Sequence, residues 1–328
     1  MRAIVDDALF AADEYDVDLV GLIEFAVTGR HIVLTEPEFR RSDDSAAYRW
    51  ILQHKPSLRE RFIVGLEQSI HAAATELRNA LSIRISKRPD PTDPLSMSAS
   101  AARALMSRPL LVIVENDEND GAFIRMMLPP DWRERFREHE AQQWIRFDSG
   151  GGLSQLKKHI ERLDSHARQR AVAVFDSDAW IPDSPSPDSD DVRRTCSTFG
   201  VDHHQLRRRA SENYLPVPAI GEWIGLNYSH RHPPHRCYHA YRRLSPLHRH
   251  HFNIKGGLNA DSGSNPPRIA EIFASLPAHT CEALRRGFTE KITSVFHQHQ
   301  FDIRESWLAD DDLESERSTL VHLIFRRI

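Results

Sequence analysis

The fold is decided by LLVIVENDENDGAFI at residues 110–124 and by AVAVFDSDA at residues 171–179. Each stretch opens with a continuous apolar run, which is typical of a strand buried on both faces of a sheet. Between the two runs, residues 121–128 and 153–163 have helical spacing, and residues 144–147 predict a short strand. This order of strands and helices predicts an α/β domain with a parallel sheet flanked by helices.

The rest of the chain predicts three further regions. Residues 1–86 are expected to be mostly helical, with the clearest helix at 57–81, and to form a docking region for a partner. KRPDPTDP at residues 87–94 cannot continue a helix or a central strand, so residues 87–107 are expected to be a linker. The catalytic domain is expected at 108–260, with a His/Arg-rich insertion, and a helical extension at 261–328.

Composition excludes several classes of protein. The 328 residues are 40% hydrophobic and 27% charged, and no run of about 18 apolar residues predicts a membrane span. The N-terminus does not have the pattern of a signal peptide. Three scattered cysteines indicate neither a disulfide scaffold nor a four-cysteine zinc site, so a reducing cytoplasm is the expected location. A net charge of −4 argues against a purely basic nucleic-acid-binding module, but an enzyme with a local basic groove is compatible with it.

Acidic residues follow both apolar runs. Glu115 comes directly after the first strand, and Asp176 and Asp178 come directly after the second. In an open parallel sheet, ligands bind beyond the carboxyl ends of the strands. Alternate residues of an extended segment point the same way, so Asp176 and Asp178 are expected to face one ion. Carboxylates favour Mg²⁺ or Mn²⁺, and such ions assist phosphodiester cleavage.

The order of these motifs resembles the TOPRIM domain. Residues 110–124 resemble its first motif, which is a strand, a glutamate, a short loop, an aspartate and a helix. Residues 171–179 resemble its second motif, a strand followed by DxD, and FDSGGGLSQLKKHIERL at 147–163 is similar to the intervening strand, glycine turn and helix. LRRRASENYLP at 206–216 resembles the Glu-Asn-Tyr segment of OLD-family nucleases and related TOPRIM defence proteins. The resemblance covers roughly residues 108–216.

The resemblance implies a role for each matching acid. Glu115 matches a metal ligand or acid–base group, and Asp176 and Asp178 match the metal-binding pair. Glu212 matches a later acid that can hold a second metal ion. Asp120 matches the aspartate of the first motif and is a further candidate ligand. One or two Mg²⁺ or Mn²⁺ ions are therefore expected.

This chain departs from the family pattern in the first motif. The family usually has glycine directly after the glutamate, where this chain has Asn116. The aspartate usually follows four positions after the glutamate, which is Asn119 here, whereas Asp120 lies one position further on. A degenerate site in a regulatory or scaffold subunit is thus an alternative to an active enzyme.

Basic residues are the expected partners of a phosphate backbone. Arg207, Arg208 and Arg209 are predicted to contact nucleic acid. The segment 230–251, dense in His and Arg, is interpreted as a second phosphate-contacting patch, with a zinc site as the alternative. Lys255 resembles the lysine with which OLD-type nucleases stabilise the phosphate, and it is the catalytic candidate beside Glu115.

These patterns together predict a metal-dependent nuclease that cleaves DNA or RNA. The resemblance further implies the effector subunit of a prokaryotic anti-phage system. The chain has no GxxxxGK[ST] motif, so a separate ABC-type ATPase is the implied partner, and a homo-oligomer is compatible with the sequence. Topoisomerase or primase activity is the alternative within the family, although neither a large strand-gating region nor a zinc module is evident.

Overall fold

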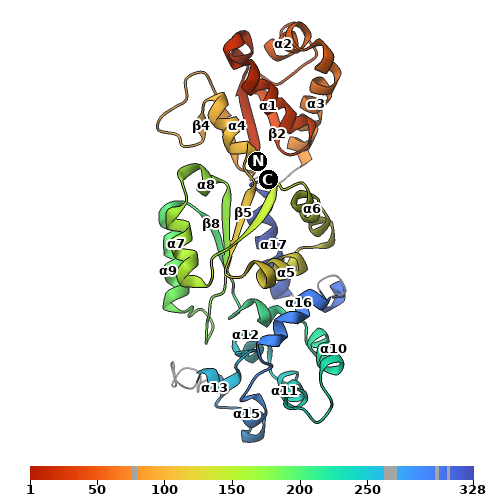
Figure 1. Ribbon diagram of the computed structural model, residues 1–328, viewed down its shortest axis with the longest axis vertical. Coiled ribbons are helices and arrows are strands. Elements are labelled where there is room, and N and C mark those ends of the chain that lie inside the picture. The colour runs from red at the N-terminus through yellow and green to blue at the C-terminus, as the bar shows by residue number, and fades with distance from the viewer. Residues whose placement is uncertain (76–79, 262–271, 300–302, 309–310) are drawn as a thin grey trace. The chain divides into compact units, whose positions relative to one another are not determined.

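The computed structural model describes residues 1–75, 80–261, 272–299, 303–308 and 311–328. The chain forms two compact units. Unit 1 consists of residues 1–110, 139–146 and 322–328, and unit 2 consists of residues 111–138 and 147–321. Two four-stranded sheets are present, and the paired strands run parallel in both (Figure 1). The predicted α/β class is confirmed.

Residues 1–86 contain more helix than strand, as the sequence predicted, but unit 1 is built around a four-stranded parallel sheet that was not predicted. Its four strands are arranged in the order β2-β1-β3-β4, and they pair in parallel. The strands are short, so their apolar runs of two or three residues were not recognised between the more obvious helices. Strands and helices of unit 1 are β1 (Arg2–Asp6), α1 (Asp16–Val27), β2 (Ile32–Glu36), α2 (Ala46–His54), α3 (Arg59–Thr75), β3 (Ser82–Ile85), β4 (Ser96–Met97) and α4 (Ala99–Ser107).

The expected linker at residues 87–107 is also corrected. It contains β4 and α4, and both belong to the core of unit 1. Ser98 caps α4 by accepting a hydrogen bond from the Ala101 N–H. Ala102 and Leu105 are completely buried in the same apolar cluster as the strand residues Ala3 and Ile83. The proline-rich residues before β4 form a turn within unit 1 rather than a boundary between domains.

Unit 2 carries the second sheet, in the order β6-β5-β7-β8. The sequence predicted β5 (Leu110–Val114), β6 (Ile145–Ser149) and β7 (Ala171–Phe175), and all three are confirmed. β8 (Asp202–Gln205) adds an edge strand whose residues are only half-buried. β5 pairs with β7 in parallel, with Ile113 opposite Ala173. The carboxyl ends of these two central strands therefore lie side by side.

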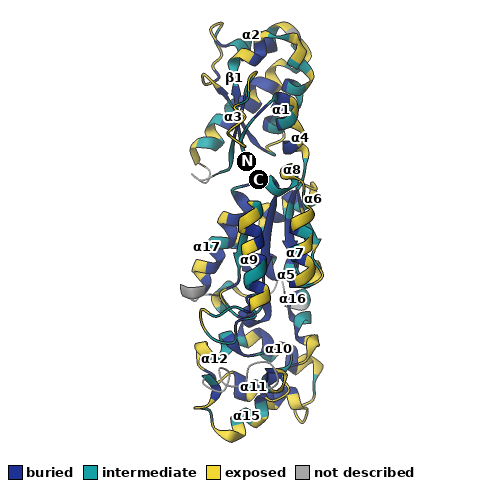
Figure 2. Cartoon of the chain, turned by 90° about the vertical axis from the view of Figure 1, so that its left-hand side faces the viewer, coloured by how far each residue is buried: buried dark blue, intermediate teal, exposed yellow. Residues whose placement is uncertain are grey.

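Helices cover both faces of this second sheet. α7 (Leu153–Arg162) and α9 (Pro187–Phe199) pack on one face, where Leu156, Ile160 and Cys196 join Ala173 in one buried cluster. α5 (Asp117–Met127) and α17 (Asp311–Phe325) lie on the other side in Figure 1. In Figure 2, the strands are buried while α7 and α9 expose their outer faces.

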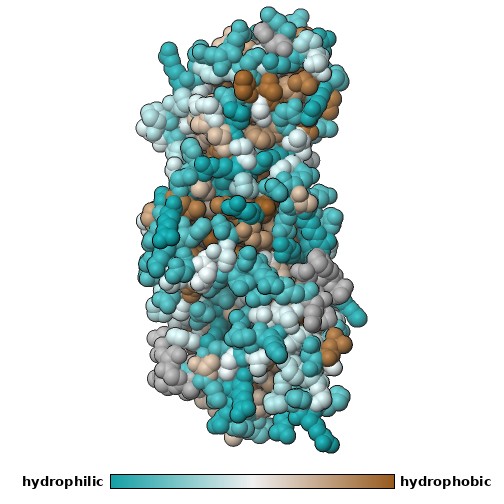
Figure 3. Space-filling model, viewed as in Figure 1, coloured by the Kyte–Doolittle hydropathy of each residue, from teal (hydrophilic) through white to brown (hydrophobic). Residues whose placement is uncertain are grey.

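Beyond β8, unit 2 is helical, which confirms the expected helical C-terminal region. Its remaining helices are α6 (Pro130–Ala141), α8 (Ser165–Gln169), α10 (Val217–Asn227), α11 (Pro233–Tyr241), α12 (Pro246–His251), α13 (Gly257–Asp261), α15 (Ala278–Leu284) and α16 (Ser294–His299). Part of the predicted helical segment 267–299 lies outside the described residues. Within the described ranges, every helix is too short or too polar to cross a membrane. Hydrophilic side chains predominate on the face shown in Figure 3.

Candidate active site

Glu115 and Asp176 lie together at the carboxyl edge of the second sheet. Each follows directly after the last residue of a central strand, β5 or β7. Because these strands are parallel neighbours, the two acids meet, and the Asp176 N–H donates to Glu115 Oε1 at 3.1 Å. The structure thus places both residues on the same edge, as the sequence predicted.

Asp120 also reaches this edge, despite its unusual spacing from Glu115. Asn116 caps α5, so Asp120 lies in the first helical turn. The Asp120 carboxylate accepts the Asn116 N–H at 2.9 Å and the Ser211 hydroxyl at 3.2 Å. The Ser211 N–H in turn donates to Asp176 Oδ1 at 2.9 Å. Ser211, which sequence reasoning missed, therefore connects the acid of α5 with the acid that follows β7.

Asp178 lies beside Asp176 through a turn rather than through strand alternation. Its φ of +49° is in the left-handed region, which aspartate tolerates better than most residues. The Asp178 N–H donates to the Arg209 carbonyl at 2.8 Å, which fixes this turn. Burial raises the pKa of the Asp178 carboxyl, and the positive charges of Arg209 and Lys255 partly counteract this.

The Glu-Asn-Tyr segment supplies one functional acid and two structural residues. Glu212 is 3% exposed, and its Oε1 lies 2.6 Å from Lys255 Nζ. The Asn213 amide donates to the carbonyls of Arg249 and Phe252 at 2.7 and 2.9 Å, which holds α12 in place. The Tyr214 hydroxyl donates to a carboxylate of α17 at 2.8 Å. The segment is therefore a rigid support that positions Glu212.

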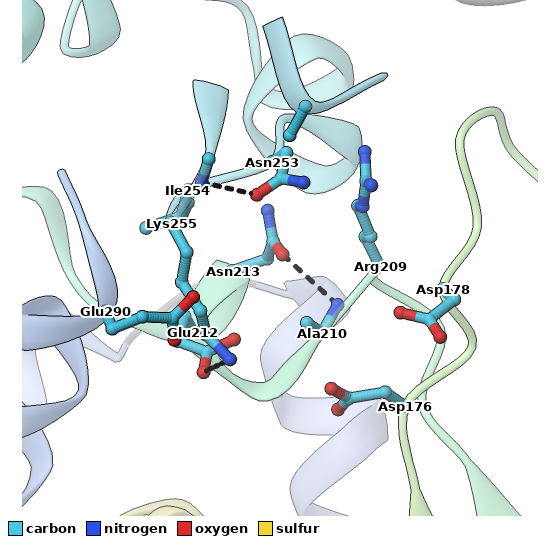
Figure 4. A pocket seen from close by; sticks show the side chains of 12 residues that line it. Asp176, Asp178, Arg209, Ala210, Glu212, Asn213, Asn253, Ile254, Lys255 and Glu290 are labelled. Carbon is cyan, nitrogen blue, oxygen red and sulfur yellow. Dashed lines mark hydrogen bonds and ion pairs between the residues drawn. The ribbon is translucent and has the colours of Figure 1, made fainter. Parts of the chain in front are cut away.

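The acids surround two adjoining pockets. Figure 4 shows one of them, with Asp176 and Asp178 on one side and Lys255, Glu212 and Glu290 on the other. Asp176, Glu212, Lys255 and Glu290 line both pockets. The second pocket is completed by further residues from the end of β5, α5, the end of β6, the glycine turn, the Glu-Asn-Tyr segment and the segment before α16: Glu115, Asn116, Asn119, Asp120, Ser149, Gly151, Gly152, Ser211 and Thr293. Glu290 and Thr293 had no recognisable sequence signal, because they lie in a single-turn 3-10 helix far along the chain from the other acids.

The glycine turn before α7 closes one side of the second pocket. The Ser149 hydroxyl and the Gly151 N–H both donate to the Glu115 carbonyl at 3.0 Å. Gly151 and Gly152 have φ values of +72° and +90°, which side-chain-bearing residues rarely adopt. The turn therefore fixes the backbone from which the Glu115 side chain projects.

Burial and mutual repulsion perturb the protonation of these groups. Burial, followed by the nearby charge of Asp120, raises the pKa of Glu115 to about 7. Burial, together with the charge of Glu212, raises the pKa of Asp120 to about 6. The pKa of Asp176 is raised well above its usual value by burial and by the surrounding carboxylates. Burial disfavours the Lys255 ammonium, but the attraction of Glu212 and Asp176 outweighs it and raises the pKa of Lys255.

The donor set fits a divalent ion held by few protein ligands. Among the described residues, no three His, Cys, Asp or Glu side chains are arranged to hold one ion directly. Mg²⁺ in phosphoryl-transfer sites is commonly held by only one or two carboxylates, and water or substrate phosphates complete its coordination. Asp176 lines both pockets, with Glu115 and Asp120 in one and Asp178 in the other. The chemistry of these side chains therefore suits such an ion, but the protein does not form a complete cage.

The three consecutive arginines do not share a role. Arg209 is 9% exposed and forms a bidentate ion pair with Asp261 at 2.7 and 2.7 Å, so it is a structural part of the pocket wall rather than a phosphate contact. The Arg208 guanidinium donates to the Asn213 carbonyl at 3.0 Å. Arg207 is exposed and lies 3.5 Å from a buried carboxylate of α17. The structure therefore gives the three arginines different surroundings, and their contact with nucleic acid stays a prediction.

Several histidines of the segment 230–251 form structural hydrogen bonds. His235 Nε2 lies 3.0 Å from the Tyr228 carbonyl, and His251 Nδ1 lies 2.9 Å from the Ala179 carbonyl. The described residues of this segment contain no group that could hold a metal ion, so its geometry does not favour the zinc interpretation.

No protein-family model, curated protein or solved structure matches this chain. The functional argument therefore depends on the residues themselves.

Proposed function

We propose that this protein is a metal-dependent nuclease of the TOPRIM type, with its active site in the two pockets around Asp176. One observation carries the proposal. Three separate segments of unit 2 bring Glu115, Asp120, Asp176, Asp178 and Glu212 to one edge of a parallel sheet, beside Lys255. Glu212 is buried and the other four acids are half-buried, and such a concentration of acids opposes folding unless a cation offsets it, so it supports a functional role.

Each group has a role in phosphodiester hydrolysis. A bound Mg²⁺ or Mn²⁺ ion would supply Lewis-acid stabilisation of the charge that develops on the phosphoryl oxygens. Asp176, shared by the two pockets, is the central ligand candidate. Glu115 or Asp120 would be a second ligand in one pocket and Asp178 in the other, and water or substrate phosphate would complete the coordination. Burial raises the pKa of Glu115 to about 7 in the metal-free protein, and a bound cation would lower it, so Glu115 would be the carboxylate that accepts a proton from the attacking water. Lys255 would stabilise a phosphoryl oxygen through its ammonium.

The biological setting is proposed from the resemblance alone. The protein would be the cytoplasmic effector of an anti-phage system and would act on DNA or RNA together with a separate ABC-type ATPase. Unit 1, with its own sheet and core, is the proposed docking region for that partner. The sequence contains no ATP-binding GxxxxGK[ST] motif, which supports the assignment of ATP hydrolysis to a separate protein.

A single substitution tests the nuclease proposal. Asp176→Asn keeps the shape of the side chain but removes its charge, so we expect cleavage of labelled DNA or RNA with Mg²⁺ or Mn²⁺ to fall at least about 100-fold. Asp131→Asn, at an exposed position of α6, is the matched control and should retain full activity. EDTA should abolish cleavage by the wild-type protein. Equal activity of the two variants, or cleavage that persists in EDTA, would contradict the proposal.

A non-catalytic regulatory subunit is the second candidate, and one observation favours it. The Lys255 ammonium lies 2.6 Å from Glu212, so the protein already places one cation among the acids. If Lys255 is the only cation that the site uses, calorimetric titration with Mg²⁺ or Mn²⁺ should detect no binding. Binding that disappears in Asp176→Asn would favour the enzyme.

A further inference from the structure

A basic groove lies beside α11 and α15 in unit 2. Arg231, Arg236, His279, Arg285 and Arg286 contribute to its lining. Among the described residues that line it, Glu282 is the one acid. The groove thus differs from the chain as a whole, which has a net charge of −4. Such a local concentration of arginine generates a positive potential that attracts anions.

Three of these arginines have no anionic partner among the residues that the structure describes. Arg231, Arg236 and Arg286 are exposed, and within the described part of the chain none of them forms an ion pair. Arg285 is paired with Glu282 at 3.1 Å, but both side chains are more than half exposed, so this ion pair is weak. Guanidinium groups bind phosphate through two parallel hydrogen bonds, which makes this set suitable for phosphate groups.

The groove is connected to the acidic pockets by two paired segments. The Phe288 N–H donates to the Ile254 carbonyl at 2.7 Å, and the Thr289 N–H donates to the Lys255 carbonyl at 3.0 Å. Further along, the Asn259 N–H donates to the Arg285 carbonyl at 3.0 Å. One end of this pairing therefore lies in the groove, and the other end carries Lys255 into the acidic pockets.

The same connection is made by residues of the second segment. Arg285 and Arg286 line the groove, whereas Glu290 lines both acidic pockets. Five residues of extended chain span at most about 17 Å, so the backbone distance from Arg285 to Glu290 cannot exceed that value. A nucleic-acid strand advances about 3.4 Å for each nucleotide along a duplex, so a few nucleotides are enough to connect the two sites.

Two glycines allow the paired segments to approach so closely. Gly257 and Gly287 have φ values of +65° and +58°. A Cβ added at Gly257 would lie 2.3 Å from the Gly287 nitrogen, and one at Gly287 would lie 2.5 Å from the Ile254 carbonyl oxygen. The juxtaposition of the groove and the acidic pockets is therefore built into the backbone.

We propose that this groove binds the phosphodiester backbone of a nucleic-acid strand and holds it next to the acidic pockets. The groove would hold the substrate of the proposed nuclease, so this role rests on the proposed function. A strand of phosphates is favoured over an acidic peptide because the arginines lead toward a site whose lysine and carboxylates suit a phosphoryl group. Contacts to phosphate carry no sequence information, so binding should be largely independent of sequence.

The test compares two double variants in a background that cannot cleave. Arg236→Ala/Arg286→Ala removes two charges from the groove. Arg40→Ala/Arg88→Ala removes two exposed arginines of unit 1, outside the segment 230–251 and not part of the groove lining, and serves as the matched control. Both are made in the Asp176→Asn protein, and binding of a labelled single strand of about 20 nucleotides is measured in EDTA at several salt concentrations.

We expect the groove variant to bind at least about tenfold more weakly, and its slope of log affinity against log salt to become shallower by about 1.4, which is about 0.7 per lost phosphate contact. The control should change less than about twofold, and all variants should have the same circular dichroism spectrum. Unchanged affinity and slope in the groove variant, or an equal loss in the control, would overturn the proposal. Tighter binding of a polyglutamate peptide than of the oligonucleotide would also overturn it.

A small substrate separates this inference from the nuclease proposal. Bis(p-nitrophenyl) phosphate has a single phosphodiester group, so when that group lies in the acidic pockets no further phosphate is available to the arginines of the groove. The groove substitutions, made without Asp176→Asn, should leave its Mn²⁺-dependent hydrolysis unchanged while cleavage of the oligonucleotide falls. If the wild-type protein hydrolyses neither substrate but binds the strand through the groove, the nuclease proposal fails and the groove stands. If cleavage occurs and binding is independent of the groove, only the groove proposal fails.

Discussion

Replacing Glu115 by glutamine tests whether the acids at the sheet edge are held at a cost in stability. Glu115 is largely buried among other carboxylates, and its pKa is raised from 4.5 to about 7. Glutamine has nearly the same shape, and its side-chain oxygen can still accept the Asp176 N–H that Glu115 accepts at 3.1 Å. The substitution therefore removes the charge and leaves the packing and this hydrogen bond in place.

The sign and size of the effect follow from the pKa shift. Between pH 4.5 and about pH 7 the folded protein holds a proton on Glu115 that the unfolded protein has released. The contribution of the Glu115 proton to the free energy of unfolding is therefore fully present below pH 4.5 and is lost progressively as the pH rises to about 7. A rise of about 2.5 units at 1.36 kcal/mol per unit corresponds to about 3 kcal/mol. We expect Glu115→Gln to stabilise the metal-free protein by about 3 kcal/mol at pH 8, and by less than about 1 kcal/mol at pH 5.

Urea unfolding in EDTA at the two pH values provides the measurement. Glu118→Gln, an exposed position of α5, is the control and should change stability by less than about 0.5 kcal/mol at either pH. Addition of Mg²⁺ at pH 8 should stabilise the wild-type protein more than Glu115→Gln, because a bound ion favours the folded state. If Glu115→Gln raises the free energy of unfolding equally at both pH values, or lowers it at pH 8, the charged Glu115 carboxylate does not destabilise the folded protein and the reasoning is refuted.

Three further substitutions test individual contacts. Lys255→Ala leaves the buried Glu212 carboxylate without its cation and should destabilise the metal-free protein by about 3 kcal/mol, with partial recovery in Mg²⁺, as measured by urea unfolding. Arg209→Ala leaves Asp261 buried without its ion pair and should lower the free energy of unfolding by about 3–5 kcal/mol. Unchanged stability together with a weaker salt dependence of nucleic-acid binding would contradict the structural role of Arg209. Gly257→Ala should lower the thermal midpoint, because its φ of +65° disfavours a side chain; an unchanged midpoint would contradict this.

The long apolar strands were predictable because their signal is local. Five consecutive apolar residues in β5 and in β7 identify buried parallel strands without any knowledge of their neighbours. The positions of Glu115 and Asp176 follow from those strands, since parallel neighbours end at the same edge. The short strands of unit 1 lack such a run, and only their parallel pairing across distant parts of the chain identifies them.

The sequence by itself determined the α/β class, the central strands and the acids that follow them, because strand periodicity and adjacency are properties of neighbouring residues. Only the tertiary structure decided which distant groups complete the site. Ser211 and Glu212 lie in one short 3-10 helix and Glu290 in another, and Lys255 lies in a turn, so none of these segments is long enough to give a periodic signal. It also decided that Arg209 is a buried partner of Asp261 rather than a surface cation, because burial and pairing depend on residues far away in the chain.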